Sequence, residues 1–241
     1  MMRSGNPALR GDVFVGSRAF GVSETMSIQG TVNKTLILLF LVVLGALWTW
    51  MNPRVLIPFF WPIAIAAFII ALVTIFKKEW AAVTSPIYAL LEGLILGGLS
   101  AIFEKAYPGI VVQAVTLTFG TLFCLLMAYK SGLIEVTENF KLGVVAATGA
   151  IALLYLINII IGFFGHRVPF IHEGGIIGIG FSIFVVIIAS LNLVLDFDFI
   201  EKGARVGAPK YMEWYGAFGL MVTLIWLYLE ILRLLSKTRR K

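Results

Sequence analysis

The chain has 241 residues, of which 60% are hydrophobic and 13% are charged, whereas a typical soluble domain carries about 25% charged residues. Together with a mean hydropathy of +0.97, this composition excludes an ordinary soluble globule and indicates an integral membrane protein. The formal net charge is +6. A basic surplus in so apolar a chain is typical of residues that face anionic lipid headgroups, so we expect no nucleic-acid partner.

The chain begins with a polar segment. Residues 1–33 carry scattered glycines and basic residues, and they lack the short basic stretch and immediate apolar core of a signal peptide. We therefore predict a flexible polar N-terminal tail over residues 1–33, a transmembrane helical bundle over residues 34–236 and a basic C-terminal tail over residues 237–241.

Long apolar runs separated by short polar breaks fill the rest of the chain. The seven runs are residues 35–51, 56–76, 84–103, 110–129, 142–164, 174–195 and 214–235. A bilayer core needs a helix of about 20 apolar residues. Six runs have 20 to 23 residues and the first has 17, and none shows the polar and apolar alternation of a membrane β-strand. The sequence predicts an all-α integral membrane protein, a bundle of seven transmembrane helices.

The basic residues of the short loops predict the orientation of the bundle. Seven of them lie in loops on the N-terminal side and three lie on the opposite side, which favours a cytoplasmic N-terminus. Seven crossings would then place the basic C-terminal tail outside. In the alternative, one apolar run enters the membrane without crossing it and both ends are cytoplasmic. We prefer seven crossings.

An acidic residue deep in the third run is the first candidate site. Glu92 follows Ser85 and Tyr88 by seven and four residues, so both precede it on the same helix face and can donate hydrogen bonds to it. Gly93 and Gly97 form a small-xxx-small pattern that permits close helix packing. Because an ionised acid at the bilayer centre costs roughly 3 kcal/mol, we favour a role for Glu92 in an ion pathway. The alternative is a protonated acid that only binds a neighbouring helix.

More acidic residues gather at the end of the sixth run. Asp196 and Asp198 lie there, two residues apart, so at most one easily faces the bundle. With seven crossings, Glu213 lies near the depth of Asp196 at the start of the last run, and Glu92 enters from the same side. The sequence thus predicts an acidic cluster at one mouth of the bundle. The alternative is a solvated helix end.

The last run carries one further acid. Glu230 has Arg233 at the next-turn spacing, and a local ion pair would explain both residues. The alternative places Glu230 in the ion pathway or gate. Tyr155 in the fifth run and Asn192 in the sixth are predicted to form interhelical hydrogen bonds.

The motifs of several enzyme classes are incomplete. His172 and Glu173 begin like a zinc-protease helix, but the second histidine is missing. Ser182 has no nucleophile elbow around it, and Cys124, inside an apolar run, is expected to be a packing residue. We therefore expect neither an enzyme nor a bound cofactor.

Four short stretches resemble those of a known family. They are the glutamate-glycine stretch at residues 92–97, the aspartate motif at residues 195–200, the last-helix stretch at residues 227–235 and the stretch GAPKYMEWYG at residues 207–216. The chain resembles the Bax inhibitor-1 superfamily of multi-pass membrane proteins over most of its length after residue 30. The fourth stretch is similar to that of a bacterial subset.

The resemblance implies a seven-helix bundle of the Bax inhibitor-1 type, with a central last helix, in a bacterial cytoplasmic membrane. It also implies a pH-sensitive calcium leak, in which two aspartates of the last two helices share a proton and hold the pore shut. Asp196 matches the first aspartate. Three residues could match the second aspartate. The neighbouring sequence motif points to Glu230, and the depth in the last helix points to Thr223. The expected position beside Asp196 points to Glu213. Because calcium prefers several oxygen ligands, we expect only a weak contact at Asp196 and a permeating ion.

Two other functions remain open at this point. In the first, the chain binds and modulates another membrane protein, such as a membrane-bound protease, as some bacterial relatives are thought to do. The polar N-terminal tail and the basic C-terminus would then be the docking features. In the second, the chain is a proton-coupled transporter in which Glu92 cycles a proton, although the sequence shows no inverted repeat. The expected partners are the lipid bilayer and calcium or protons.

Overall fold

The computed structural model describes residues 25–163 and 175–239. Within these residues the chain forms seven long helices and one short 3-10 helix, and no strand. The elements are α2 (Ile28–Met51), α3 (Pro53–Phe76), η2 (Lys78–Trp80), α4 (Ala81–Ala106), α5 (Ile110–Lys130), α6 (Glu138–Phe163), α8 (Ile176–Arg205) and α9 (Met212–Arg239). All seven long helices contain a span long and apolar enough to cross a membrane, which confirms the predicted seven-helix membrane protein.

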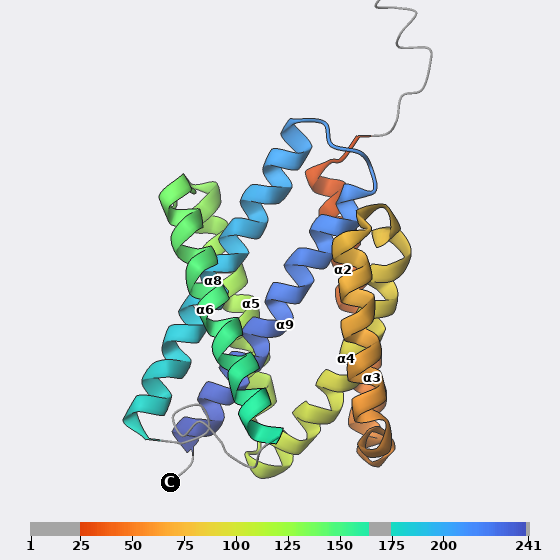
Figure 1. Cartoon of the computed structure of the whole chain (residues 1–241), viewed down its shortest axis with the longest axis vertical. Coiled ribbons are helices and arrows are strands. Elements are labelled where there is room, and N and C mark those ends of the chain that lie inside the picture. Colours follow the sequence, from red (N-terminus) through yellow and green to blue (C-terminus); the bar gives the residue numbers. More distant parts are fainter. Residues whose placement is uncertain (1–24, 164–174, 240–241) are drawn as a thin grey trace, which may run out of the picture.

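The two ends of the described chain lie at opposite ends of the bundle. Figure 1 shows the start of α2 at one end and the end of α9 at the other, as seven crossings require. The helix boundaries differ from those predicted for the tails, because residues 28–33 belong to α2 and residues 237–239 belong to α9. The rest of both predicted tails, residues 1–24 and 240–241, lies outside the described residues, as do His172 and Glu173.

Helix α9 is the centre of the bundle, as the resemblance implied. It crosses the molecule between α2, α3 and α4 on one side and α5, α6 and α8 on the other (Figure 1), and it packs against α2, α4, α5 and α8. Its Met221 is fully buried in a cluster with Leu38 of α2, and its Leu227 is fully buried in a second cluster with Leu193 of α8. Apolar burial of α9 therefore joins the two halves of the bundle.

Glycines allow α2 and α4 to approach each other closely. A β-carbon at Gly93 would overlap the carbonyl oxygen of Val42, and a β-carbon at Gly97 would overlap that of Ala46. Only glycine fits at such a backbone contact. The predicted small-xxx-small packing of the third span is therefore confirmed, with α2 as its partner.

Polar side chains cap helix ends. The Ser27 hydroxyl accepts a hydrogen bond from the Gly30 N–H at 2.9 Å and caps the N-terminus of α2. Glu104 of α4 accepts hydrogen bonds from the N–H groups of Gly109 and Val111 at 2.6 and 3.1 Å, where α5 begins. A carboxylate at a helix N-terminus satisfies amides that have no partner inside the helix, so Glu104 fixes the α4–α5 turn.

Candidate functional site

Asp196 lies on the face of α8 that is turned toward α9. A β-carbon added at Gly219 of α9 would lie 3.8 Å from Asp196 Oδ1. The Thr223 hydroxyl, one turn further along α9, lies near the same carboxyl group and donates a hydrogen bond to the carbonyl of Gly219 at 3.2 Å. The other oxygen, Oδ2, is buried and has no hydrogen-bond partner. Because native structures rarely leave a buried polar atom unpaired, this oxygen marks Asp196 as a candidate functional group.

Three residues were candidates for the partner of Asp196, and Thr223 is the one that lies against it. The hydrogen bonds and ion pairs that the structure shows for Glu213 and Glu230 lead to other residues. The depth of the residue in the last helix is thus the criterion that agrees with the structure. A threonine hydroxyl stands where the family resemblance implied a second acid.

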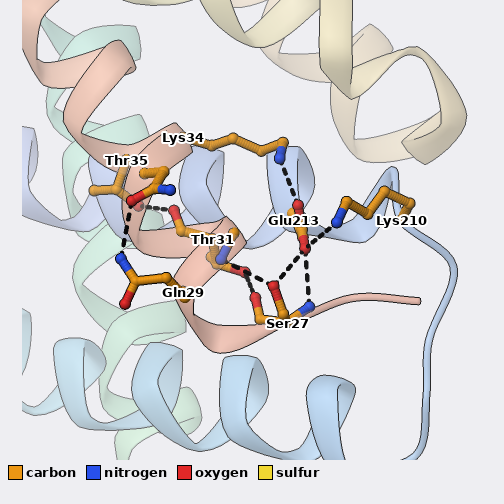
Figure 2. A network of polar contacts seen from close by, with 9 residues as sticks. Ser27, Gln29, Thr31, Lys34, Thr35, Lys210 and Glu213 are labelled. Carbon is orange, nitrogen blue, oxygen red and sulfur yellow. Dashed lines mark hydrogen bonds and ion pairs between the residues drawn. The ribbon is translucent and has the colours of Figure 1, made fainter. Parts of the chain in front are cut away.

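Glu213 joins the N-terminal end of α2 to α9. Its fully buried carboxylate accepts hydrogen bonds from the N–H and the hydroxyl of Ser27, both at 2.9 Å. It also forms an ion pair with Lys34 and lies 3.3 Å from the Nζ of Lys210 (Figure 2). Sequence reasoning placed Glu213 near Asp196 and missed this link. Ser27 is a good N-cap residue, but it lies eight residues before the apolar run, and no local pattern indicates its contact with Glu213.

Glu230 forms the local ion pair that its spacing predicted. Arg233 Nη1 lies 2.8 Å from its Oε1. The hydroxyl of Tyr155 on α6 donates a hydrogen bond to the same oxygen at 2.8 Å, which confirms an interhelical role for this tyrosine. Asn192 of α8 likewise donates a hydrogen bond to Thr148 of α6 at 2.7 Å. These contacts tie α6 to α9 and to α8.

Asp198 and Glu201 lie near the C-terminal end of α8, at the end of the bundle where α2 begins. Both acids pair with basic residues. Asp198 lies 2.7 Å from Lys202 on its own helix and 3.7 Å from Lys141 of α6. Glu201 pairs with Arg205 at 2.7 Å. The predicted acidic cluster therefore separates into paired acids at the helix end and Asp196, which lies deeper and has no basic partner among its described contacts.

Glu92 is half-buried on α4, and its side chain interacts with the hydroxyl of Tyr88 one turn earlier. Ser85, predicted to support the same acid, has a buried hydroxyl without a hydrogen-bond partner. At 1.5 Å per residue, Glu92 lies about 16 Å from the start of α4, and Asp196 lies about 14 Å before the end of α8, so both acids are well inside their helices.

Lys237 was assigned to a basic tail and is instead buried, with 3% of its surface exposed. Its ammonium group donates hydrogen bonds to the carbonyl of Gly178 at 2.9 Å and to the hydroxyl of Ser182 at 2.8 Å. Arg239 donates hydrogen bonds to the carbonyl of Pro108 and to the side chain of Gln113. The basic end of α9 therefore fastens this helix to α8 and α5.

The described residues contain no group of three or more Asp, Glu, His or Cys side chains that could hold a metal ion. At Asp196 the site offers one carboxyl group, whose Oδ2 is unpaired, and the neighbouring hydroxyl of Thr223. Such a set can gain or lose a proton, and it can make a single weak contact with a hard cation. These groups suit a transient contact for a permeating ion better than a high-affinity binding site.

Comparisons with known proteins place these residues in a family. The sequence model of a family described as Bax inhibitor 1 like matches residues 6–240, almost the whole chain, including Glu92 and Asp196. No curated protein matched the chain, and no solved structure did.

Proposed function

The chain belongs to the Bax inhibitor-1-like family, and we propose that this multi-pass membrane protein is a pH-sensitive calcium leak of a bacterial cytoplasmic membrane. In this proposal Asp196 belongs to the gate and Glu92 to the ion pathway. Both acids lie inside membrane-crossing helices, where ionisable residues are expensive and usually functional.

The observation that carries the proposal is the unpaired Oδ2 of Asp196. The other acids of α8 and α9, namely Asp198, Glu201, Glu213 and Glu230, all pair with a lysine or an arginine. A basic partner fixes the charge of an acid and occupies its oxygens. Asp196 keeps one oxygen free to exchange a proton or to meet a cation.

Proton exchange at this position would couple the leak to pH. A buried carboxyl group changes its charge when it gains or loses a proton, and the change is felt strongly where little water screens it. Calcium, a hard cation, would find one carboxyl group there rather than a cage of oxygens. Such a contact is weak enough for the ion to leave, which slow permeation requires.

The test is calcium flux into proteoliposomes that carry the purified protein, measured from mildly acidic to mildly basic pH. We expect flux above that of empty vesicles, a pH dependence that Asp196→Asn abolishes, and a several-fold change of rate in Glu92→Gln. Glu138→Gln is the matched control, because the Glu138 side chain is 86% exposed at the start of α6. Flux that is equal in all four proteins at every pH would contradict the proposal.

The alternative function is a regulator that binds another membrane protein, such as a membrane-bound protease. Its predicted basic docking tail is used in part inside the protein, since Lys237 and Arg239 bind α8 and the α4–α5 region. We therefore place this function second. Wild-type protein that gives no flux above empty vesicles would favour it, and crosslinking in native membranes would be the next experiment.

A further inference from the structure

The first described residues close over the end of the α8–α9 pair. Thr25 forms an antiparallel bridge with Pro209 in the loop between these helices, and the Met26 N–H donates a hydrogen bond to the carbonyl of Ala208 at 2.7 Å. Figure 1 shows the start of α2 beneath this loop, between the diverging ends of α8 and α9. We call residues 25–31 the N-terminal clasp.

Met26 fills the space between the two helices. Its side chain is 3% exposed. A β-carbon at Gly203 of α8 would lie 2.8 Å from Met26 Sδ, and one at Gly216 of α9 would lie 3.5 Å from Met26 Cε. Ile200 and Thr31 approach Gly216 just as closely, at 3.2 and 3.4 Å from the same added carbon. Two glycines thus make room for one methionine, which is tightly packed against Gly203 and in ordinary van der Waals contact at Gly216.

This apolar layer lies directly outside Asp196. On α8, Asp196 precedes Ile200 by four residues, and on α9, Gly219 follows Gly216 by three residues. At 1.5 Å per residue, the layer of Asp196 and Gly219 lies about 5 Å deeper than that of Ile200 and Gly216, which is one helical turn. An ion that entered from the N-terminal side between α8 and α9 would meet Met26 before Asp196.

Glu213 holds the clasp in this position. The N–H and the hydroxyl of Ser27 both donate to it, Lys34 pairs with it from α2, and Lys210 reaches it from the α8–α9 loop (Figure 2). One fully buried carboxylate therefore binds both segments that meet over the helix pair. Hydrogen bonds to a charged group are stronger than neutral ones, so the link is firm while the charge remains.

We propose that the N-terminal clasp is a closure over Asp196, with Met26 as its plug and Glu213 as its anchor. This inference rests on the proposed conduction past Asp196, because it requires the clasp to leave the α8–α9 mouth before an ion reaches the acid from this side. Met26 and Glu213 act by position and make no contact with the ion in the closed state.

A reversible disulfide tests the closure. Directly opposed residues of an antiparallel pair have Cα atoms about 4.5 to 5.5 Å apart, within the roughly 4.4 to 6.8 Å that a disulfide spans. Thr25→Cys with Pro209→Cys, in a Cys124→Ser background, should therefore lock the clasp. We expect oxidation to lower calcium flux in proteoliposomes several-fold and a reductant to restore it, with each single-cysteine variant unaffected. Locked protein that conducts as fast as reduced protein would overturn the proposal.

A second measurement does not depend on flux. Gly219→Cys in the Cys124→Ser background places a thiol beside Asp196, and a charged, membrane-impermeant thiol reagent added from the N-terminal side reports access to it. We expect the disulfide lock to slow labelling and Met26→Ala to speed it several-fold. Ile28→Ala is the matched control, since Ile28 belongs to the same segment and is 51% exposed.

The labelling result separates the two proposals. Absent flux in every protein, together with faster labelling in Met26→Ala, would contradict the calcium leak and leave the closure standing. Labelling that is equally fast in Met26→Ala, in Ile28→Ala and in the locked protein would overturn the closure. If Gly219→Cys fails to fold, Thr223→Cys places the thiol one turn deeper and gives the same comparison.

Discussion

Two acids on neighbouring helices, Glu213 of α9 and Asp196 of α8, have opposite surroundings. Glu213 is fully buried, accepts two hydrogen bonds from Ser27 and pairs with Lys34 and Lys210. Asp196 has a threonine hydroxyl beside it and a buried oxygen with no partner. All the oxygens of the Glu213 carboxylate thus have hydrogen-bond or ion-pair partners, whereas one oxygen of Asp196 has none, although the two acids lie on neighbouring helices.

The difference distinguishes an acid that maintains the structure from an acid that is free to react. A satisfied buried carboxylate is costly to replace, because every group that donates to it or pairs with it loses a charged partner. An unpaired buried atom already costs stability, so its replacement removes a penalty. Substitutions at the two acids should therefore change stability in opposite directions, and four predictions test this.

The largest effect is expected at the anchor. Glu213→Gln keeps the shape of the side chain and removes its charge, which leaves Lys34 and Lys210 facing a neutral group. We expect the free energy of unfolding to fall by about 3 kcal/mol, the order found when one member of a buried pair is removed. Thermal unfolding of the purified protein in detergent measures it.

The matched control is Glu138→Gln, which removes an acid whose side chain is 86% exposed and pairs with Lys141. Exposed pairs contribute little, so we expect a change of less than about 1 kcal/mol. Equal melting temperatures for the two variants would show that Glu213 is not an anchor, and the contrast with Asp196 would lose one side.

The second effect compares the same substitution beside each acid. In Gly30→Ala the new β-carbon overlaps the Glu213 carboxylate, so the anchor must shift, and we expect a loss of about 2 kcal/mol. In Gly219→Ala the new carbon lies 3.8 Å from Asp196 Oδ1, an ordinary contact, so the better helix propensity of alanine should raise stability by up to about 1 kcal/mol. Melting temperatures of both variants decide the matter, and a loss at Gly219 would mean that the space beside Asp196 is filled.

Hydropathy and helix length predicted most of the fold, because the bilayer imposes both on any spanning helix. The close packing of α4 on α2 was also predictable, since Gly93 and Gly97 carry a local spacing signal. The position at which α2 begins was not predictable from the sequence. Of the seven residues 28–34 that precede the first apolar run, five are polar or glycine, and the segment becomes helical because Ser27 caps it and Glu213, 186 positions away from Ser27, binds that cap. No local pattern carries a contact of that separation.

For the charged residues, too, partners on the same helix were predictable from the sequence, and partners on other helices were not. The ion pair of Glu230 and Arg233 was predicted from their spacing, because both lie on one helix. Lys237 was counted as a solvated charge, yet it reaches Gly178 and Ser182 on α8. Asp196 was predicted as a candidate site at the end of the sixth span, and it lies inside α8, which continues to Arg205. Its contact with Thr223 depends on the rotation of α8 against α9, which composition and periodicity do not specify.

The third effect has the opposite sign to the first. Asp196→Asn supplies a neutral amide of nearly the same shape, so it removes the cost of an ionised carboxylate that has no basic partner. We expect the protein to become more stable by about 1 kcal/mol, while its calcium flux loses its dependence on pH. This is the pattern of a site at which stability is given up for function. A loss of stability as large as that of Glu213→Gln would show that Asp196 is a second structural anchor.

The smallest effect is expected at Thr223. Thr223→Val is nearly isosteric and removes the one hydroxyl beside Asp196, whereas Thr223→Ser keeps it. The Thr223 hydroxyl also reaches the carbonyl of Gly219 on its own helix at 3.2 Å, so its removal should change the free energy of unfolding by less than about 1 kcal/mol. The informative measurement is the pH dependence of flux. If Thr223 replaces a second acid as the partner of Asp196, the profile shifts in Thr223→Val and stays at its wild-type position in Thr223→Ser. A profile that is the same in both variants would mean that Asp196 titrates without help from α9, and the contrast with Glu213 would then rest on the isolation of Asp196 alone.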